Sequence, residues 1–309
     1  MWFIFALITL LAWGSADLFY KKGADEADKY SHLKTTMMVG FVMGAHAIAT
    51  LIFTGWDYDP INLVMYLPVS AMYISSMAVG YLGLRYLELS IASPIQNASG
   101  AVVAILCLVI LGQKMSTWSA VGVVLICVGV FVLGLLERGR DELPPSDGEH
   151  KKYRSGVVAI LFPIGYCILD SLGTFFDAWY LDDFETTLLR NVTEDNLERV
   201  ANISYELTFF FCALVIFVFM LIKKQNLTGR PQGSRLCAAV LETAGQFTYV
   251  YAMSGHGAVA APMIGSFCIV SVLLSRIFLK EKLTFLQYLT VGGVILGIIC
   301  LGISEGLAE

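Results

Sequence analysis

Charge is scarce in this sequence. Only 15% of its 309 residues are Asp, Glu, Lys or Arg, whereas a soluble domain carries about 25%. Apolar residues make up 57% of the chain, and the mean hydropathy is +0.72. The net charge is −5, so the basic excess of a nucleic-acid-binding protein is missing. The composition excludes an ordinary soluble domain and predicts a protein whose surroundings are membrane lipid.

Motifs for metals, cofactors and ATP are also missing. The seven cysteines lie far apart in apolar stretches and form no Cys-x-x-Cys pair, which argues against a zinc site or a disulfide framework. The four histidines do not form paired metal ligands, and no Ser-Lys dyad occurs at helical spacing. A Gly-x-x-x-x-Gly-Lys-Ser/Thr phosphate loop is absent as well. We therefore expect no metal, no cofactor, no direct use of ATP and no enzymatic activity.

Long apolar runs dominate what is present. About 20 apolar residues cross the roughly 30 Å of hydrocarbon in a bilayer. Ten such stretches alternate with polar turns, near residues 2–20, 35–54, 63–86, 92–111, 118–136, 155–180, 203–222, 234–254, 258–279 and 285–303. They are continuously apolar, which favours helices over a barrel. The first run is too long for a signal peptide and lacks its basic start. The prediction is an all-α polytopic membrane protein with ten transmembrane helices.

Three polar segments interrupt the apolar runs. Residues 137–154 contain adjacent prolines and many charges, and we interpret them as a cytoplasmic linker between residues 1–136 and 155–309. Residues 181–202 form an acidic insertion, and residues 223–235 form a basic loop.

Basic residues predict the orientation in the membrane. If the ten spans alternate in direction, all Lys and Arg fall on one side except Lys114, Arg190 and Arg199. The positive-inside rule places the basic side in the cytoplasm. Both termini and the acidic insertion would then lie outside the cell membrane (plasma or inner membrane).

Weak self-similarity relates the two halves. Residues 81–134 align without a gap on residues 249–302, and the first spans align separately, which sets Asp17 on Asp170. The matched pairs of the longer alignment include Tyr81 with Tyr249 and Pro94 with Pro262. Chance similarity between two apolar segments is the alternative. A repeat of five spans has an odd number of crossings, so its second copy would be inverted. Many secondary transporters have this plan, with the site near the midplane between the copies.

The combined features resemble a known family. In each half a proline stands near the start of the fourth span, and a Gly-rich fifth span follows a short turn. The turns read Leu111-Gly112-Gln113-Lys114 and Leu279-Lys280-Glu281-Lys282, and Trp13-Gly14 in the first span also fits. The chain is similar to the EamA-like branch of the drug/metabolite transporter superfamily, except in the linker and the acidic insertion. The resemblance implies two inverted five-helix repeats and transport of small metabolites by alternating access. Family members usually keep both termini in the cytoplasm, so the orientation predicted above departs from the family.

Carboxylates inside apolar spans are the first candidates for function, because each ionisable group costs roughly 2.5–3.5 kcal/mol to insert. Asp170 lies well inside the sixth span and predicts a proton site or a counter-ion for a cationic substrate. The alternative is a structural carboxyl that neighbouring helices satisfy. Asp17 has the same two interpretations, or it lies at the interface because Lys21 follows closely. Asp177 and Glu206 flank the acidic insertion, so we expect them to be exposed to water.

The eighth span has a polar face. Glu242, Gln246 and Tyr249 follow at helical spacing, and a polar stripe on a span should face the protein interior. A role in a substrate or proton pathway is one interpretation, and a structural role is the other. His46 in the second span is expected to be a packed or hydrogen-bonded histidine.

Prolines, amides and aromatic residues supply further candidates. Pro94 and Pro262 either break the fourth and ninth spans or simply suit their first turns. Gln96 and Asn97 follow the first break and are candidates to line a substrate site. Aromatic candidates for the same pocket, or for packing, are Trp13, Tyr73, Tyr81, Tyr166 and Tyr251.

Two Gly-x-x-x-Gly pairs, Gly40/Gly44 and Gly293/Gly297, predict close helix packing inside the protein rather than dimerisation. Whether the protein is a monomer or a homodimer stays open.

The sequence predicts a secondary transporter for a small polar metabolite such as an amino acid, an amine or a sugar, with proton coupling as an option. The alternative is a lipid-carrier or lipid-linked sugar flippase of the same fold, which would need a lateral opening for a long tail. A membrane-embedded enzyme is less favoured, since no catalytic constellation is visible. The substrate, the direction of transport and the coupling ion are not defined by the sequence.

Cysteine labelling tests the orientation. In a background without the seven native cysteines, an impermeant thiol reagent should label a cysteine at position 190 in intact cells but not one at position 150. The reason is that the basic end is predicted to face the cytoplasm. Labelling at 150 without labelling at 190 would mean that the protein is oriented the other way.

Overall fold

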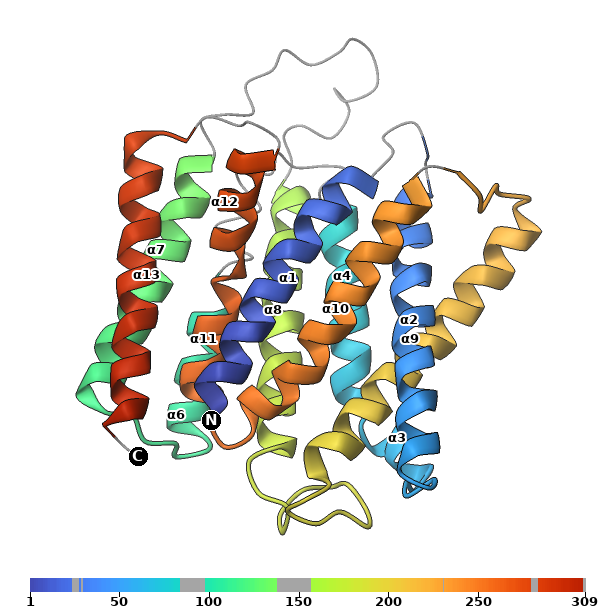
Figure 1. The fold of residues 1–309 in the computed structure, drawn as a ribbon, viewed down its shortest axis with the longest axis horizontal. Helices are drawn as coiled ribbons and strands as arrows, with labels where there is room; N and C mark the ends of the chain where they lie inside the picture. Colours follow the sequence, from blue (N-terminus) through green and yellow to red (C-terminus); the bar gives the residue numbers. More distant parts are fainter. Residues whose placement is uncertain are drawn as a thin grey trace.

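The computed structural model describes residues 1–23, 28, 30–83, 98–137, 157–229, 231–278 and 283–307, and every regular element within these ranges is a helix. The helices run side by side, and the marked chain ends lie at the same end of the bundle (Figure 1). Their bounds are α1 Trp2–Gly23, α2 Ser31–Phe53, α3 Ile61–Met65, α4 Leu67–Gly83, α6 Ser99–Val109, α7 Thr117–Glu137, α8 Val157–Tyr180, α9 Leu197–Ile222, α10 Pro231–Met253, α11 Gly257–Gly265, α12 Phe267–Phe278 and α13 Phe285–Gly306.

In the part of the chain that the structure describes, six helical segments are long and apolar enough to cross a membrane. They are Trp2–Tyr20, Ser31–Phe53, Thr117–Leu136, Leu197–Ile222, Gly257–Phe278 and Phe285–Gly306, the fifth of which contains both α11 and α12. Helix α6 is apolar but shorter. Helix α10 has 23 residues and carries Arg235, Glu242 and Gln246 among its apolar residues. The described residues thus form an all-helical bundle with several membrane-spanning candidates.

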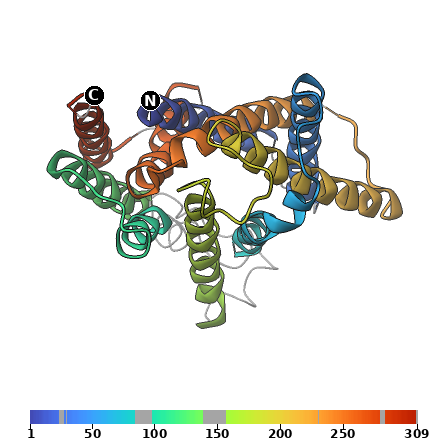
Figure 2. The same cartoon turned by 90° about the horizontal axis from the view of Figure 1, so that it is seen from below.

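Helices from the two halves of the chain interleave. Helix α1 packs on α10, α4 on α8, α2 on α9, α6 on α11, and α7 on α13. Each of these pairs joins a helix before residue 138 to a helix after residue 156. The α7–α13 pair lies at one edge of the bundle in both views (Figures 1 and 2). The closest helix contacts therefore lie between the halves, and the centre of the protein is built from both.

Glycines allow the closest approaches between these helices. A Cβ on Gly40 would lie 2.5 Å from the carbonyl oxygen of Phe209, and one on Gly44 would lie 2.3 Å from the Phe210 ring. Gly122 and Gly297 face each other, so that a Cβ on either would lie 2.8 Å from the carbonyl oxygen of the other. Gly40, Gly44 and Gly297 therefore pack inside the protein as predicted, whereas a Cβ on Gly293 would meet no atom within 4 Å.

The ninth apolar stretch is interrupted after its proline. Pro262 lies inside α11, and the break between α11 and α12 falls at Ser266, whose hydroxyl donates to the carbonyl of Met263 at 2.6 Å. Gly100 near the start of α6 lies against Pro262, since its Cβ would be 3.3 Å from the proline Cα. Pro94 lies outside the described residues.

The acidic insertion is shorter than the sequence predicted, because α9 begins at Leu197. The segment packs against the bundle through Leu189, which is 6% exposed. The Asn62 side-chain amide donates to the Arg190 carbonyl oxygen at 2.9 Å, and its oxygen accepts from the Arg190 backbone N–H at 2.7 Å. These bonds attach the segment to the start of α3.

The α7–α13 contact gives a stability prediction. Gly297→Ala should destabilise the protein by about 1–3 kcal/mol, because its Cβ meets backbone in a packed interface. Gly293→Ala on the same helix is the matched control, since no atom lies within 4 Å of its Cβ position and alanine is the better helix former. Thermal unfolding in detergent measures both variants, and equal midpoints would show that α7 and α13 do not approach this closely.

Candidate functional site

A chain of hydroxyl groups links α4, α8 and α10. The Tyr73 hydroxyl lies 2.8 Å from that of Thr174 and 2.6 Å from that of Tyr249. One turn after Thr174, Asp177 accepts a hydrogen bond from Tyr66 and contacts the Tyr249 hydroxyl. We call these five residues the central hydroxyl network. It forms because Thr174 and Asp177 share one face of α8, which Tyr73 of α4, Tyr249 of α10 and Tyr66 at the junction of α3 and α4 all approach.

Asp177 is buried, which corrects a sequence prediction. We expected this carboxylate to be exposed to water, but only 1% of the residue is exposed. Helix α8 continues to Tyr180, so Asp177 remains inside the bundle. The spacing of Asp170, Thr174 and Asp177 along one helical face was the signal available in the sequence.

Tyr205 of α9 is a further buried tyrosine of this region. It is 7% exposed and lies close enough to Glu242, Asp177 and Asp170 to interact with their charges. Its ring packs edge-on against Tyr73, with 5.6 Å between the ring centroids. The sequence analysis missed Tyr205, because one tyrosine in an apolar span carries no distinguishing pattern.

Asp170 lies beside α6. Its carboxylate receives a hydrogen bond from the Ser99 side chain, and the neighbouring Ser171 hydroxyl is 3.5 Å from the Ser99 carbonyl oxygen. Asp170 also lies near Tyr73. The structure therefore brings Asp170 into the same region as the central hydroxyl network, partly exposed rather than fully buried.

Asp17 and Glu242 lie across the α1–α10 contact. The Ser271 hydroxyl donates to Asp17 Oδ2 at 2.6 Å, and the Tyr20 hydroxyl donates to Glu242 Oε2 at 3.3 Å. The charge of Asp17 acts on Glu242. The structure thus brings Asp17, which the sequence alignment sets on Asp170, close to Glu242.

Trp13 connects this pair to the hydroxyl network. Its indole N–H donates to the Glu242 backbone carbonyl at 3.3 Å, and its ring stacks on Tyr249 with centroids 5.3 Å apart. Gly245 makes room, since a Cβ there would lie 2.4 Å from the indole. Gln246 and Tyr249 are each 3% exposed, so the polar face of α10 points into the protein.

Glu206 and His46 form a separate pair, in which Glu206 is buried and His46 is partly exposed. Both Glu206 carboxylate oxygens lie within 2.9 Å of His46 Nδ1, and Glu206 is fully buried. The predicted hydrogen-bonded histidine is therefore present, whereas the expected exposure of Glu206 was wrong. The pair joins α2 to α9.

Some predicted site residues fall outside this description. Gln96 and Asn97, like Pro94, lie outside the described residues, and Tyr81 lies in α4 with its side chain outside the description. Within the described part of the chain, no group of three or more His, Cys, Asp or Glu side chains is placed to hold a metal ion.

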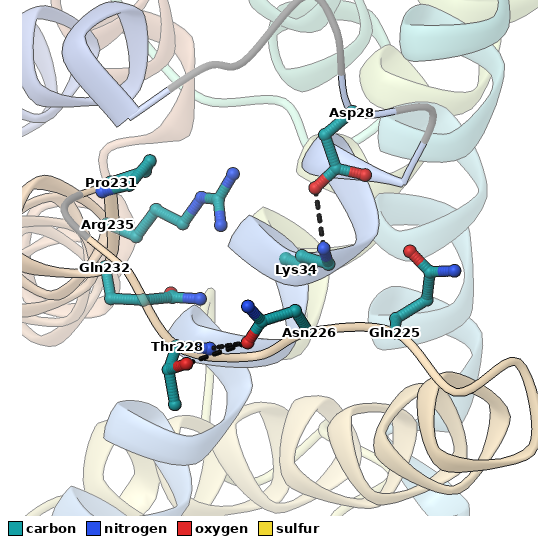
Figure 3. Close-up of a pocket in the computed structure, with 8 residues that line it drawn as sticks. All are labelled: Asp28, Lys34, Gln225, Asn226, Thr228, Pro231, Gln232 and Arg235. Atoms are coloured by element: carbon teal, nitrogen blue, oxygen red, sulfur yellow. Dashed lines mark hydrogen bonds and ion pairs between the residues drawn. The ribbon is translucent and has the colours of Figure 1, made fainter.

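A second polar site lies at the end of the bundle where α1 ends and α2 and α10 begin. Figure 3 shows this pocket of about 360 Å³, lined by Asp28, Lys34, Gln225, Asn226, Thr228, Pro231, Gln232 and Arg235. Asp28 Oδ2 lies 2.7 Å from Lys34 Nζ. Partial burial favours a higher pKa for Asp28, but hydrogen bonds from Lys34 and the Tyr30 backbone, together with the charges of Lys34 and Arg235, outweigh this effect and hold the pKa below its usual range. None of the predicted site residues lines this pocket.

Comparison with known proteins agrees with the helical architecture. The family model described as the EamA-like transporter family matches residues 1–135 and 185–303. One similar solved structure, described only as the crystal structure of a protein, has a TM-score of 0.71 and 11% sequence identity. The alignment covers 99% of this chain and 98% of that one, and at this identity it shows the fold alone. No curated protein matches the chain.

A double-mutant cycle tests the central hydroxyl network. Tyr66→Phe and Asp177→Asn should be coupled by about 0.5–3 kcal/mol in unfolding free energy, because they share one buried hydrogen bond. Tyr58→Phe with Asp177→Asn is the control pair, since Tyr58 bonds to Ser204 instead, and its coupling should be near zero. Unfolding in mixed micelles measures both cycles. Equal coupling in the two pairs would mean that Tyr66 and Asp177 do not interact.

Proposed function

Because the chain belongs to the EamA-like transporter family, we propose that it is a secondary active transporter for a small polar metabolite, working by alternating access in the plasma or inner membrane. The observation that carries this proposal is the placement of Asp170, Asp177 and Glu242 inside the bundle, each hydrogen-bonded to a hydroxyl group from the first half of the chain. Carboxylates are costly within a membrane and mark substrate or proton pathways. An enzyme is not proposed, since the family is one of transporters.

The pattern of helix contacts supports two inverted five-helix repeats. The sequence alignment equates the first, third and fourth spans with the sixth, eighth and ninth. If each helix is replaced by the helix aligned with it, the α1–α10 contact corresponds to the α8–α4 contact, and the α1–α12 contact corresponds to the α8–α6 contact. All four contacts are present. Counting α3 with α4, and α11 with α12, as one span each gives the proposed ten. In such a plan, one half rocks against the other around a site near the midplane.

We propose that Asp170 and Glu242 bind the coupling proton. An ionised carboxylate without a cation is unstable in a low dielectric, so each needs either a proton or a positively charged ligand before the bundle closes around it. Both carboxylates belong to the second half of the chain and their partners to the first: Asp170 of α8 bonds to Ser99 of α6, and Glu242 of α10 bonds to Tyr20 of α1. A change in their protonation therefore alters contacts between helices of the two halves, which is what coupling requires.

The lipid-carrier flippase remains the alternative activity. It would use the same fold but would pass a long tail sideways between helices. The experiment below separates the two, because a flippase moves a fluorescent lipid between leaflets and does not accumulate a water-soluble compound inside vesicles.

Proteoliposomes with an imposed pH gradient test the proposal. Metabolite profiling of cells that lack or overproduce the protein selects the compounds, and a panel of amino acids, amines and sugars serves as the starting set. Wild-type protein should accumulate at least one compound in a gradient-dependent way. Either Glu242→Gln or Asp170→Asn should keep exchange at equal pH but lose at least tenfold of the driven accumulation. Glu185→Gln, at an exposed position, is the matched control and should behave as wild type.

Full gradient-driven accumulation in both the Glu242→Gln and the Asp170→Asn variant would show that neither carboxylate couples transport to the proton gradient. Translocation of a fluorescent lipid without any solute accumulation would favour the flippase.

A further inference from the structure

The His46–Glu206 pair is an ionisable site that the proposed transport path does not use. His46 Nδ1 lies 2.9 and 2.8 Å from the two carboxylate oxygens of Glu206. The Glu206 side chain is fully buried, and that of His46 is 34% exposed. Glu206 lies about 13 Å along α9 from Leu197, the first residue of the helix. Ionisable groups at such depth in a membrane protein mark proton or ion pathways.

The pair can hold either one proton or two. With one proton, the Nδ1–H donates to an ionised carboxylate, and the pair carries one negative charge. A second proton makes the pair neutral, whether it adds to Nε2 of the ring or resides on the carboxylate. Histidine changes its charge near neutral pH, and a net negative charge is costly where the carboxylate is buried. The contact is therefore suited to take up and release a proton.

Two buried polar atoms connect Glu206 with the start of α9. Asn202 Oδ1 and Arg199 Nε are buried and have no hydrogen-bond partner among the described residues. Arg199, Asn202 and Glu206 follow at spacings of three and four residues, which places them on one face of the helix. The Asn202 side chain also contacts Glu206. Ordered water usually pairs with buried polar atoms that the protein leaves unpaired, so this face of α9 is expected to be hydrated.

A pocket of about 490 Å³ lies where this face begins. Its lining includes Asp57 and Tyr58, which follow α2, and Val200 of α9. Asp57 Oδ2 lies 2.5 Å from Arg199 Nη2, so the pocket adjoins the first residue of the polar face. The end of α2 and the start of α9 lie at the same end of the bundle as the marked chain ends (Figure 1). A route from water to Glu206 can therefore begin in this pocket.

We propose that His46 and Glu206 form a proton-binding site at the α2–α9 contact, which exchanges protons with water at the end of the bundle where α9 begins. A proton from an acid in the water passes along the polar face of α9 and forms an O–H or N–H bond on the pair. The pair joins a helix of each half, so its charge state makes this contact sensitive to the pH on one side of the membrane. This site goes beyond the proposed transport function and does not depend on it.

The neighbouring helix α10 leaves the pair as a separate titrating unit. Helices α9 and α10 both pack on α2. From α10, the Phe247 ring lies edge-on to His46, with 5.5 Å between the centroids. The ionisable residues of α10 nearest to Phe247 contact other helices: Glu242 bonds to α1, Tyr249 bonds to α4, and Tyr251 packs on α1.

The ionisable groups of α2 and α9 are also placed elsewhere. Tyr205 of α9 packs on α4, and Arg199 is paired with a carboxylate at the end of the bundle. On α2, Lys34 lies more than three turns before His46. Glu206 is therefore the charged group that faces His46 in the part of the chain that the structure describes.

NMR of the histidine nitrogens tests proton binding without a transport assay. In the full chain, isotope-labelled at histidine in lipid nanodiscs, His46→Gln identifies the His46 signals among those of the four histidines. His46 should titrate reversibly between about pH 5 and 9. Glu206→Gln keeps the size of the side chain and removes its charge, so the His46 midpoint should fall by about one pH unit or more. Signals of His46 that stay constant over this range, or a midpoint that Glu206→Gln leaves unchanged, overturn the proposal.

Two controls accompany the titration. Glu185→Gln removes a carboxylate at an exposed position and should leave the His46 midpoint unchanged. The exposed His256 is an internal reference, and its signals should be the same in every variant.

A hydrophilic thiosulfonate reagent tests the water route, because it modifies a cysteine only where water reaches it. In a background without the seven native cysteines, Asn202→Cys should react, more slowly than Asp57→Cys at the pocket. Phe211→Cys should stay unmodified, because Phe211 is 50% exposed on the outside of the same helix, where lipid surrounds it. Reaction at position 57 without reaction at 202 overturns the route. Glu206→Cys replaces Asn202→Cys if gel filtration shows that the latter does not fold.

The outcomes separate this inference from the proposed function. Gradient-driven accumulation in proteoliposomes, together with a His46 that does not titrate, would overturn the proton site and leave secondary transport intact. A titrating His46 in a protein that accumulates no compound would support the site and contradict the transport proposal.

Discussion

Every polar group inside a bilayer must find its partner within the protein, because the hydrocarbon offers none. Single hydroxyls meet this constraint locally. Thr50 donates to the carbonyl of His46, and Thr208 donates to that of Ser204, each one turn back along its own helix. Buried carboxylates cannot be satisfied this way and must reach another helix. The network of tyrosines around Asp177 and the pairing of Glu206 with His46 are two solutions to the same problem.

These contacts also define how the halves of the chain meet. The His46–Glu206 pair joins α2 to α9, and the central hydroxyl network joins α4 to α8 and α10. Close glycine contacts, such as that of Gly122 with Gly297, pack helices of the two halves tightly against each other. A bundle with such contacts moves by shifting its packed helices against one another rather than by bending them. In the proposed mechanism, the bonds that must change during transport are those at the centre, where hydroxyls can rotate from one carboxylate to another.

Much of this arrangement was predictable from composition and pattern. The scarcity of charge and the length of the apolar runs identify the membrane class, and degenerate motifs together identify the family. The polar face of Glu242, Gln246 and Tyr249 follows from helical periodicity alone. Asp177 and Glu206 were misjudged, because proximity to a polar segment says nothing about whether a tyrosine or a histidine lies opposite. Their partners, Tyr66 and His46, are more than a hundred residues away in the chain.

The position of Tyr205 against Tyr73 was out of reach for a different reason. It depends on how α9 packs on α4, and no spacing within one helix encodes the rotation of the other. The break at Ser266 was also unpredictable in position, since Pro262 marks a weak point while the serine hydroxyl and its bond to Met263 decide where the helix ends.

Alternating access is the central claim, and distances between spin labels at the two ends of the bundle test it most directly. One label pair would occupy Trp56 and Glu185, and the other Lys22 and Lys223, all exposed positions; each pair joins the two halves at one end. Double electron–electron resonance in lipid nanodiscs at acidic and alkaline pH would measure both. The account predicts that one pair moves apart while the other moves closer as the pH changes. Distances that stay fixed at both ends, or change in the same direction, would contradict it.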